Sequence, residues 1–389
     1  MSVADLALQR NKYKHLNDEE WRWFLQQVEG RERTADKLPT FAAIEDWWYP
    51  VRLSCEQCSS ELTARYKASL VSGEKMVDLT GGYGVDTFFL SEQCEQTDYV
   101  EQNAELCRIA THNFHVQRDN VQSTKVSIHN TSAEEFLQTA GQYDLIFLDP
   151  ARRDDHGGKV FRLEDCTPNV AELLPTLLAH LTPNGRLMLK LSPMLDLTQA
   201  VHKLQGDNVQ GTKANWDIQV VAVKNEVKEV LLLSHQFSEV RNQTITAIDL
   251  SKKDQAFIFT REEESTALTE YSEYSEYSEK FLYEPNSAIL KAGAYKLVAQ
   301  RFGLQKLDVN THLYISDALV ENFPGRVWKI TEQLTTGKYQ NTNANVLVRN
   351  YPLTAELLKK KLHLRDGGTA FVIGCRVAGK PTLFYAERV

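Results

Sequence analysis

A chain of 389 residues is longer than the range in which one hydrophobic core keeps growing, so two or three domains are expected. Its 42% apolar and 25% charged residues indicate a globular protein and exclude a disordered one. The sequence has no apolar run of membrane-spanning length and no basic start followed by an apolar segment, which favours a cytoplasmic protein. Its six cysteines are too few and too scattered for a disulfide framework, which agrees with a reducing compartment.

The net charge of -8 is unevenly distributed along the chain. Residues 1–70, 71–250 and 251–283 carry -1, -10 and -4, whereas residues 284–389 have 15 Lys and Arg against 8 Asp and Glu, which gives +7. The acidic total alone argues against a nucleic-acid partner, but it conceals this basic end of the chain. The sequence therefore predicts a basic module attached to an acidic protein.

Residues 1–70 are expected to form an N-terminal helical region. Trp21, Phe24, Leu25 and Val28 recur on one face of a helix, and the preceding NDEE supplies a cap and first-turn acids.

No metal is expected in this chain. Cys55 and Cys58 form a CxxC pair, but a tetrahedral zinc site needs two further ligands and there is no second pair. His112 and His115 would complete such a site only by a coincidence of folding. We interpret the pair as two thiols near helix ends.

Residues 71–235 alternate short apolar runs with helical periods. The predicted strands are KMVDLT (75–80), TDYVE (97–101), KVSIH (125–129), YDLIFLDP (143–150) and RLMLKLS (186–192). The predicted helices lie near 84–93, 102–117, 132–139, 167–181 and 196–204. This alternation predicts an α/β domain with a parallel, doubly wound sheet. The segment 217–235 predicts two further strands with a tight turn at Lys224 to Glu226, a hairpin that closes the edge of the sheet.

The rest of the chain is expected to divide into three parts. Residues 236–283 contain strand-like runs and the repeat EYSEYSEYSEK (270–280), which is polar throughout and is interpreted as a solvated linker. Residues 284–326 and 327–389 are interpreted as two small α+β units. The first begins with EPNSAILKAGAYKLVAQRFG (284–303), which predicts one amphipathic helix that ends at Gly303.

A glycine-rich turn in MVDLTGGYGVDT (76–87) lies between the first strand and the first helix, where parallel α/β folds bind their ligand. A dinucleotide-binding loop would need glycine where Thr87 stands. Asp78 would repel a pyrophosphate and attract a cation, and S-adenosylmethionine carries a sulfonium and an ammonium group. Glu101, at the end of the second strand, can accept hydrogen bonds from both ribose hydroxyls. Ser132 and Ala133, after the third strand, are expected at the adenine edge.

Through VDLTGGYG, YVEQN, SAEEF and LDPARR, in this order and spacing, residues 71–235 resemble the class I S-adenosylmethionine-dependent methyltransferases. The resemblance implies a Rossmann-like, mostly parallel seven-stranded sheet with a reversed last strand, and S-adenosylmethionine as the cofactor. Thr80 replaces the first glycine of the usual loop, and Ser132 replaces an acid often found there. The cofactor-binding residues that we expect are Asp78, Thr80, Gly82, Tyr83, Gly84, Glu101, Ser132, Ala133 and Asp149.

In that fold the fourth strand ends beside the methyl group, and here it ends in LDPARR (148–153). Methyltransferases of exocyclic amines often have Asp or Asn, two prolines and an aromatic residue at this point, whereas this chain continues from Asp149 and Pro150 with Ala151 and Arg152. Asp149 can still accept hydrogen from an N–H nucleophile and orient its lone pair. A stacking surface would have to come from Arg152 or from a residue elsewhere such as Tyr83.

The predicted catalytic residues are Asp149, Pro150, Arg152 and Arg153. Three roles stay open for the two arginines: contact with a phosphate or a base edge, salt bridges to Asp154 and Asp155, or a solvated loop. Lys190 and Ser192 reach the same edge of the sheet, where a lysine is more often structural.

The segments EPNSAILKAGAYKLVAQRFGL, THLYIS, FPGRVWKI and ANVLVRNYPLTAELLKKKLHLRDGGTAF are similar to a bacterial family in which a class I methyltransferase precedes a ferredoxin-like unit and a THUMP-like domain. The resemblance implies structured RNA, such as rRNA or tRNA, as the partner. The positive charges expected to contact phosphates are those of Lys291, Lys296, Arg349, Lys359, Lys360, Lys361 and Arg365. The alternative is that the KKK run is only the exposed face of an amphipathic helix.

The function expected from these features is methyl transfer from S-adenosylmethionine to a nitrogen of an RNA base. Two alternatives stay open. One is a non-catalytic RNA-binding protein that retains the cofactor fold, and the other is a methyltransferase acting on a small molecule or a protein.

Overall fold

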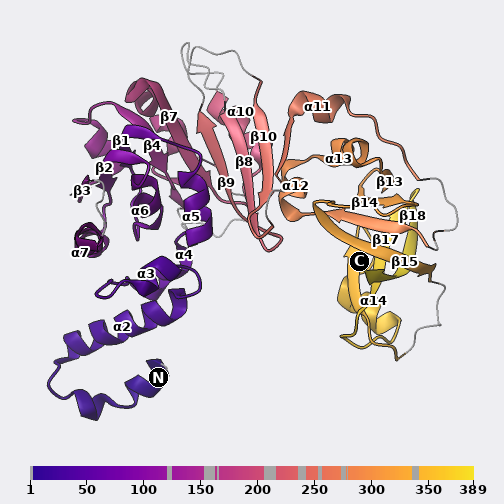
Figure 1. The fold of residues 1–389 in the computed structure, drawn as a ribbon, viewed down its shortest axis with the longest axis horizontal. Coiled ribbons are helices and arrows are strands. Elements are labelled where there is room, and N and C mark those ends of the chain that lie inside the picture. Colours follow the sequence, from indigo (N-terminus) through magenta and orange to yellow (C-terminus); the bar gives the residue numbers. More distant parts are fainter. Residues whose placement is uncertain are drawn as a thin grey trace. The chain divides into compact units, whose positions relative to one another are not determined.

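The computed structural model describes residues 3–120, 125–152, 163, 166–205, 216–234, 242–252, 256–272, 277, 279–334 and 341–389. The chain forms two compact units (Figure 1). The first comprises Met1–Asp217 and Glu229–Arg241, and the second comprises Ile218–Lys228 and Asn242–Val389. No helix in the described part of the chain has the length and apolar character that a membrane crossing requires.

The N-terminal region is helical, as predicted. Its elements are α1 (Val3–Ala7), the short 3-10 helix η1 (Arg10–Tyr13), α2 (Asp18–Thr34), α3 (Pro39–Ala43), α4 (Arg52–Gln57) and α5 (Glu61–Ala68). Asn17 and Glu20 form a capping box at the start of α2. The fully buried Phe41 of α3 packs edge-on against Phe88, 4.9 Å between ring centroids, so this region shares a core with the helix after the glycine loop.

The sheet of the first unit has the strand order β9-β7-β4-β1-β2-β3. Its strands are β1 (Gly73–Asp78), β2 (Cys94–Val100), β3 (Lys125–His129), β4 (Tyr143–Leu148), β7 (Leu181–Leu191) and β9 (Glu226–Ser234). The first five are parallel to their neighbours, and β9 is antiparallel to β7. The predicted alternation and the reversed last strand are therefore confirmed.

The helices between these strands are α6 (Val85–Ser91), α7 (Ala104–Asn120), α8 (Ala133–Leu137), α9 (Val170–Ala179) and α10 (Leu197–Gln205). A two-stranded ribbon of β5 (Ala151–Arg152) and β6 (Cys166–Thr167) lies beyond β4 in the chain. Because β1, β2, β3 and β4 are parallel, the residues that follow them lie at one edge of the sheet.

Lys224 and Asn225 form the predicted tight turn between β8 (Trp216–Val223) and β9, and both have positive φ angles. The expectation that this hairpin closes the edge of the sheet is wrong. In the second unit β10 (Thr244–Asp249) pairs in parallel with β8 and satisfies its backbone groups, and β11 (Phe257–Thr260) pairs with β10. The helix α11 (Arg261–Thr266) follows with its own capping box.

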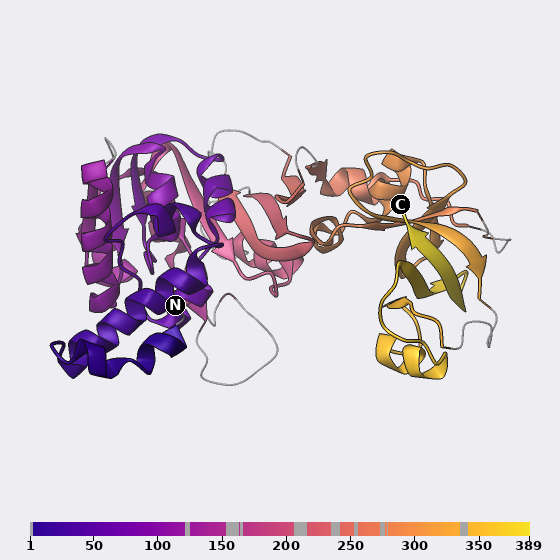
Figure 2. The same ribbon diagram turned by 60° about the horizontal axis from the view of Figure 1, so that its bottom comes forward.

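The C-terminal strands form one seven-stranded sheet that runs through both of the small α+β units expected, and the division at residue 326 stays a prediction. Figure 2 shows these strands in orange to yellow. The order of this sheet is β13 (Gln305–Asp308), β14 (Thr311–Ser316), β12 (Phe281–Pro285), β15 (Gly325–Gln333), β18 (Lys380–Arg388), β17 (Ala370–Val377) and β16 (Asn345–Arg349). The helix predicted over 284–303 is two helices, α12 (Ser287–Ala292) and α13 (Tyr295–Phe302), because Gly293 adopts a left-handed conformation between them. Gly303 ends α13, as predicted. The last helix is α14 (Ala355–Lys361).

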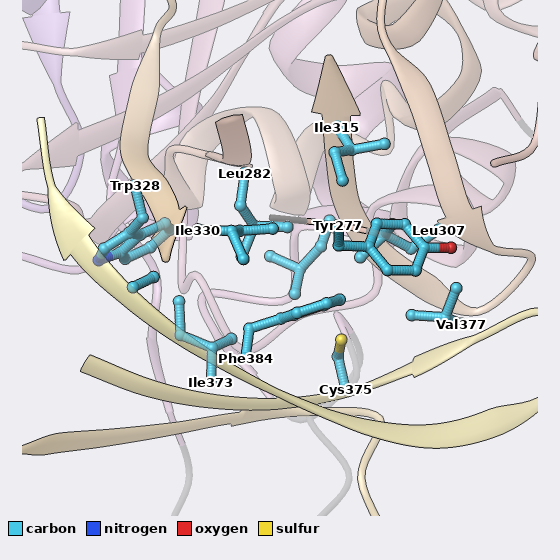
Figure 3. Packing of buried hydrophobic residues seen from close by; sticks show 12 residues of the cluster. Tyr277, Leu282, Leu307, Ile315, Trp328, Ile330, Ile373, Cys375, Val377 and Phe384 are labelled. Atoms are coloured by element: carbon cyan, nitrogen blue, oxygen red, sulfur yellow. The ribbon is translucent and has the colours of Figure 1, made fainter. Parts of the chain in front are cut away.

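Tyr277, in the EYS repeat, packs into the core of this sheet (Figure 3). Its side chain is 1% exposed, and its ring lies edge-on to Phe384 with 5.3 Å between centroids. Trp328 and Ile330 of β15 belong to the same cluster. The interpretation of the repeat as a solvated linker is wrong at this residue. The aromatic ring of Tyr277 is buried among apolar side chains, although its neighbours in the sequence are polar. Residues 273–276 and 278 of the repeat lie outside the described residues.

Replacing Tyr277 by alanine is expected to lower the free energy of unfolding of the second unit by about 3 kcal/mol, because a buried aromatic side chain is lost and a cavity remains. Urea unfolding followed by circular dichroism measures the change. Tyr271→Ala is the matched control, because that tyrosine of the same repeat is 45% exposed and should change stability by less than about 0.5 kcal/mol. If Tyr277→Ala lowered the free energy of unfolding as little as Tyr271→Ala, by less than about 0.5 kcal/mol, the repeat would contribute no core residue.

Candidate active site

The glycine loop between β1 and α6 is held tightly against β2. Gly81 donates from its amide to the carbonyl of Val100 at 2.9 Å, and a β-carbon at Gly81 would lie 2.2 Å from the Tyr99 ring. The Tyr99 hydroxyl donates to the carbonyl of Gly82 at 2.6 Å. Gly82 and Gly84 have positive φ angles, of 55° and 82°. Gly81 and Tyr99 were absent from the residues expected at the site, although Gly81 is the first of the three glycines that the sequence shows in this loop.

Asp78 turns into the loop instead of toward a ligand. Its side chain is buried, Oδ1 accepts from the Thr80 amide at 2.9 Å, and Oδ2 accepts from Thr87 Oγ1 at 2.6 Å. Burial raises the pKa of Asp78 to about 7. Both carboxylate oxygens of Asp78 thus accept hydrogen bonds within the loop, and a direct contact between Asp78 and a cation stays a prediction.

Thr80 connects the ends of β1 and β4. Its hydroxyl accepts from the amide of Asp149 at 2.7 Å. The residue that replaces the first glycine of the usual loop thus fixes the position at which the fourth strand ends.

Glu101 lies beside the glycine loop. Oε2 accepts from the Gly82 amide at 2.9 Å and Oε1 accepts from the Asn103 amide at 2.7 Å. Asn130 donates to the carbonyls of Glu101 and Gln102, which joins the segments after β2 and β3. The half-exposed carboxylate of Glu101 is thereby presented at the same edge of the sheet as the loop.

Ser132 and Ala133 lie at the start of α8. Ser132 is the N-cap, and its hydroxyl accepts from the Glu135 amide at 3.1 Å. Ala133 is buried. The structure gives both residues a role in beginning the helix.

The Tyr83 side chain is buried against the N-terminal region, so it does not provide the stacking surface considered for it. Its hydroxyl accepts from Trp47 Nε1 at 3.0 Å and donates to the carbonyl of Trp48 at 3.3 Å. Its ring lies edge-on to Phe41. Tyr83 therefore anchors the glycine loop to the helical region.

Asp149 and Pro150 follow β4 at the carboxyl edge of the sheet and are half-exposed. Oδ2 of Asp149 lies 2.5 Å from Nζ of Lys190, at the end of β7. Ser192, which follows β7, accepts from the Met194 amide within its own turn. The backbone of Arg152 belongs to β5, while its side chain and all of Arg153 lie outside the described residues.

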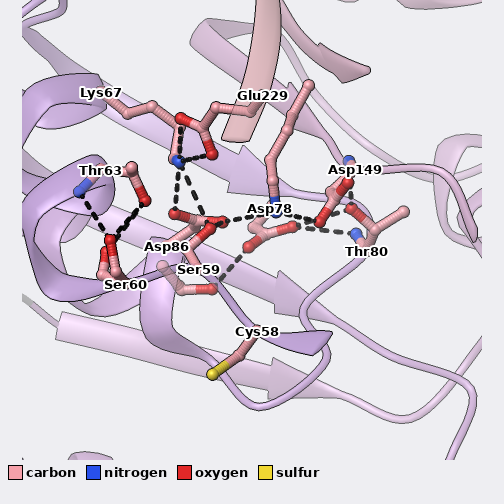
Figure 4. A network of polar contacts seen from close by, with 12 residues as sticks. Cys58, Ser59, Ser60, Thr63, Lys67, Asp78, Thr80, Asp86, Asp149 and Glu229 are labelled. Carbon is pink, nitrogen blue, oxygen red and sulfur yellow. Dashed lines mark hydrogen bonds and ion pairs between the residues drawn. The ribbon is translucent and has the colours of Figure 1, made fainter. Parts of the chain in front are cut away.

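A cluster of buried charges is connected to Asp149 through Lys190 (Figure 4). Lys67 of α5 contacts Glu229 of β9, and it lies 3.2 Å from Oδ1 of Asp86 in α6. Lys190 lies 3.5 Å from Oδ2 of the same Asp86. The sequence offered no local signal for this cluster, because Lys67 and Glu229 are 162 residues apart.

Cys55 and Cys58 are free thiols, and burial raises the pKa of Cys55 to about 12. Within the described ranges, no group of three or more His, Cys, Asp or Glu side chains is arranged to hold a metal ion.

The basic residues of the second unit that were expected to contact phosphates differ in their exposure and in their ion pairs. Lys296, Lys360, Lys361 and Arg365 are exposed. Lys291 is half-buried, and Lys359 forms an ion pair with Asp366. Arg349 is ion-paired with the buried Glu284, which also binds Arg326. Two arginines share this one carboxylate, so the three groups sum to +1, and a phosphate contact of Arg349 stays a prediction.

The groups at this edge fit S-adenosylmethionine. The loop of glycines leaves room for close approach to the backbone, and Glu101 offers a carboxylate for vicinal hydroxyls. Asp149 adds a second half-exposed carboxylate at the same edge of the sheet.

Comparisons with known proteins agree with these features. Residues 281–324 match a family model for a ferredoxin-like domain, and residues 325–388 match a THUMP domain-like model. Two proteins described as uncharacterized S-adenosylmethionine-dependent methyltransferases, from two strains of Mycobacterium tuberculosis, are 22% identical over 370 residues. That alignment covers 91% of this chain and 92% of each relative.

The crystal structure of a "putative methyltransferase" from Porphyromonas gingivalis W83 is similar over nearly the whole chain, with a TM-score of 0.82 and 32% sequence identity. The match covers 96% of this chain and 92% of that one. The expected class I fold is confirmed, and the chain belongs with the Porphyromonas gingivalis protein to one family of S-adenosylmethionine-dependent methyltransferases.

Proposed function

We propose that this methyltransferase transfers the methyl group of S-adenosylmethionine to a nitrogen of an RNA base, in rRNA or tRNA. The observation that carries the proposal is Asp149, a half-exposed carboxylate held at the end of β4 by Thr80 and Lys190, beside the glycine loop. A carboxylate in this position suits an N–H nucleophile, because it accepts the hydrogen and directs the nitrogen lone pair.

Different residues of the chain would bind the cofactor and orient the nucleophile in such a reaction. The glycine loop and Glu101 would hold the cofactor, which would supply an electrophilic methyl group on a sulfonium. Asp149 would accept a hydrogen bond from the N–H nucleophile, orient its lone pair and take up the proton that the methylated nitrogen releases. Pro150 keeps the backbone extended where the nucleophile would approach. The side chains of Arg152 and Arg153 are proposed to contact a phosphate or a base edge.

RNA as the substrate rests on the second unit. Its THUMP domain-like match and its excess of seven positive charges over residues 284–389 both favour a polyanion. The exposed Lys360, Lys361 and Arg365 lie at the end of α14 and in the segment after it, and within the described residues no carboxylate forms an ion pair with them. We place this activity in the cytoplasm.

The test is incubation of the protein with S-adenosylmethionine labelled in the methyl group and total RNA from cells that lack the gene. Digestion to nucleosides and mass spectrometry should find the label in one methylated nucleoside. Cofactor binding without label in RNA contradicts the proposal and favours a non-catalytic binding protein. Label in protein or small molecules favours the other alternative.

Asp149→Ala is expected to abolish methyl transfer while the Kd for S-adenosylmethionine changes by less than about tenfold, roughly 1.4 kcal/mol. Transfer is measured with the labelled assay and affinity by calorimetry. Asp149→Asn is the matched variant, because it keeps one accepting oxygen and should retain more activity than the alanine variant. A large loss of affinity would place Asp149 in the cofactor site instead of beside the nucleophile.

Reversal of two charges, Lys360→Glu with Lys361→Glu, is expected to weaken RNA binding about tenfold or more and to flatten its dependence on salt. Binding is measured by fluorescence anisotropy between 50 and 300 mM salt, about the range where counterion release is visible. Lys228→Glu is the control, because Lys228 is exposed but pairs with Glu226 in β9. If the dependence of RNA binding on salt were unchanged in the double variant, the lysines of α14 would be a solvent-exposed face that does not contact RNA.

A further inference from the structure

Among the described residues, Lys190 is the side chain that contacts the carboxylate of Asp149. Its Nζ lies 2.5 Å from Oδ2 of Asp149 and 3.5 Å from Oδ2 of Asp86, and the side chain is 12% exposed. Burial alone would lower the pKa of Lys190, but the carboxylates of Asp149, Asp86 and Glu229 raise it above the ordinary value. Lys190 is therefore a charged ammonium at the end of β7.

Asp86 is shared between two lysines. Its Oδ1 faces Lys67 at 3.2 Å, and its Oδ2 faces Lys190 and also accepts from Ser59 Oγ at 2.7 Å. Lys67 is fully buried and contacts both carboxylate oxygens of Glu229, at 2.6 and 2.7 Å. The position of Lys190 thus depends on residues of the N-terminal helical region.

The charges of this cluster do not cancel. Lys67 and Lys190 give +2, while Asp86, Glu229 and Asp149 give -3, so the sum is -1. Asp86 and Glu229 are buried, whereas the side chain of Asp149 is 39% exposed. The excess negative charge therefore lies next to the surface, at Asp149.

We propose that Lys190 is a positioning residue of the methyl-transfer site, which anchors Oδ2 of Asp149 so that Oδ1 is left to face the nucleophile. This inference rests on the proposed function. Anchoring one oxygen restricts rotation of the carboxylate and keeps it ionised, and the ammonium offsets most of the buried negative charge. A lysine with a purely structural role would instead affect folding without changing the charge felt by the cofactor.

The first test compares affinities for S-adenosylmethionine and S-adenosylhomocysteine by calorimetry. The two ligands differ by a methyl group and the positive charge of the sulfonium. In Lys190→Met three carboxylates face one lysine, so the ratio of the Kd for S-adenosylmethionine to that for S-adenosylhomocysteine should fall about five- to tenfold. Lys228→Met, which removes an exposed charge, should leave the ratio at the wild-type value.

An unchanged ratio in Lys190→Met overturns the inference. If Lys190→Met does not fold, Lys190→Gln provides the same measurement, because glutamine retains a polar group for the buried carboxylates. Lys190→Arg keeps the charge and should keep a ratio within about twofold of wild type.

The second test is turnover with bulk RNA. Lys190→Met should lower kcat at least about thirtyfold while the KM for S-adenosylmethionine changes less than about threefold. In Lys190→Ala, where the shorter side chain leaves space for an amine, added ethylammonium should restore part of kcat. Undiminished kcat overturns the inference. If the wild-type protein labels no RNA, the proposed function fails, whereas the affinity ratio, which needs no RNA, still decides whether Lys190 sets the charge at this site.

Discussion

The ion pairs of Lys67, Asp86, Glu229 and Lys190 are the interaction on which the candidate site depends. Removing such charges from water costs several kcal/mol for each ion, about the size of the attraction that each pair regains, so the cluster is stable only when every member is in place. Its members come from α5, α6, β7 and β9. The cluster therefore ties the N-terminal helices to the sheet at the edge where Asp149 emerges, and a change in any one element reaches the site.

Hydrogen bonds from the same edge complete the site around Asp149. The Thr80 hydroxyl accepts a hydrogen bond from the Asp149 amide. The Asp78 carboxylate accepts from the Thr80 amide, and the Glu101 carboxylate accepts from the Gly82 amide in the same loop. Each of these residues follows or ends a parallel strand, which is why one edge collects them. Tyr83 adds a link from the loop to Trp47 and Trp48 of the helical region. The loop is thus pre-organised by contacts on two sides, and cofactor and nucleophile would meet between rigid elements.

Local signals in the sequence were sufficient for the parallel strands of the first unit, the helices between them, the glycine loop and the strand-end positions of Glu101 and Asp149, because periodicity and turn chemistry are properties of neighbouring residues. Contacts between distant residues were not predictable in this way. Asp78 turns inward because Thr87, the third residue of α6, donates to its Oδ2. The ion pair of Arg349 with Glu284, 65 residues earlier, had no local signal in the sequence. Tyr277 belongs to a polar repeat and still fills the core of the C-terminal sheet.

The central claim is that the charge cluster holds Asp149 beside a cofactor bound on the glycine loop. A crystal structure of the protein with S-adenosylhomocysteine tests it most directly. If the cluster holds Asp149 in this way, the ribose hydroxyls lie on Glu101, Oδ1 of Asp149 faces the ligand sulfur across the space left for the nucleophile, and Lys190 still contacts Oδ2. A ligand bound elsewhere, or Asp149 turned away from the sulfur with Lys190 detached, would contradict it.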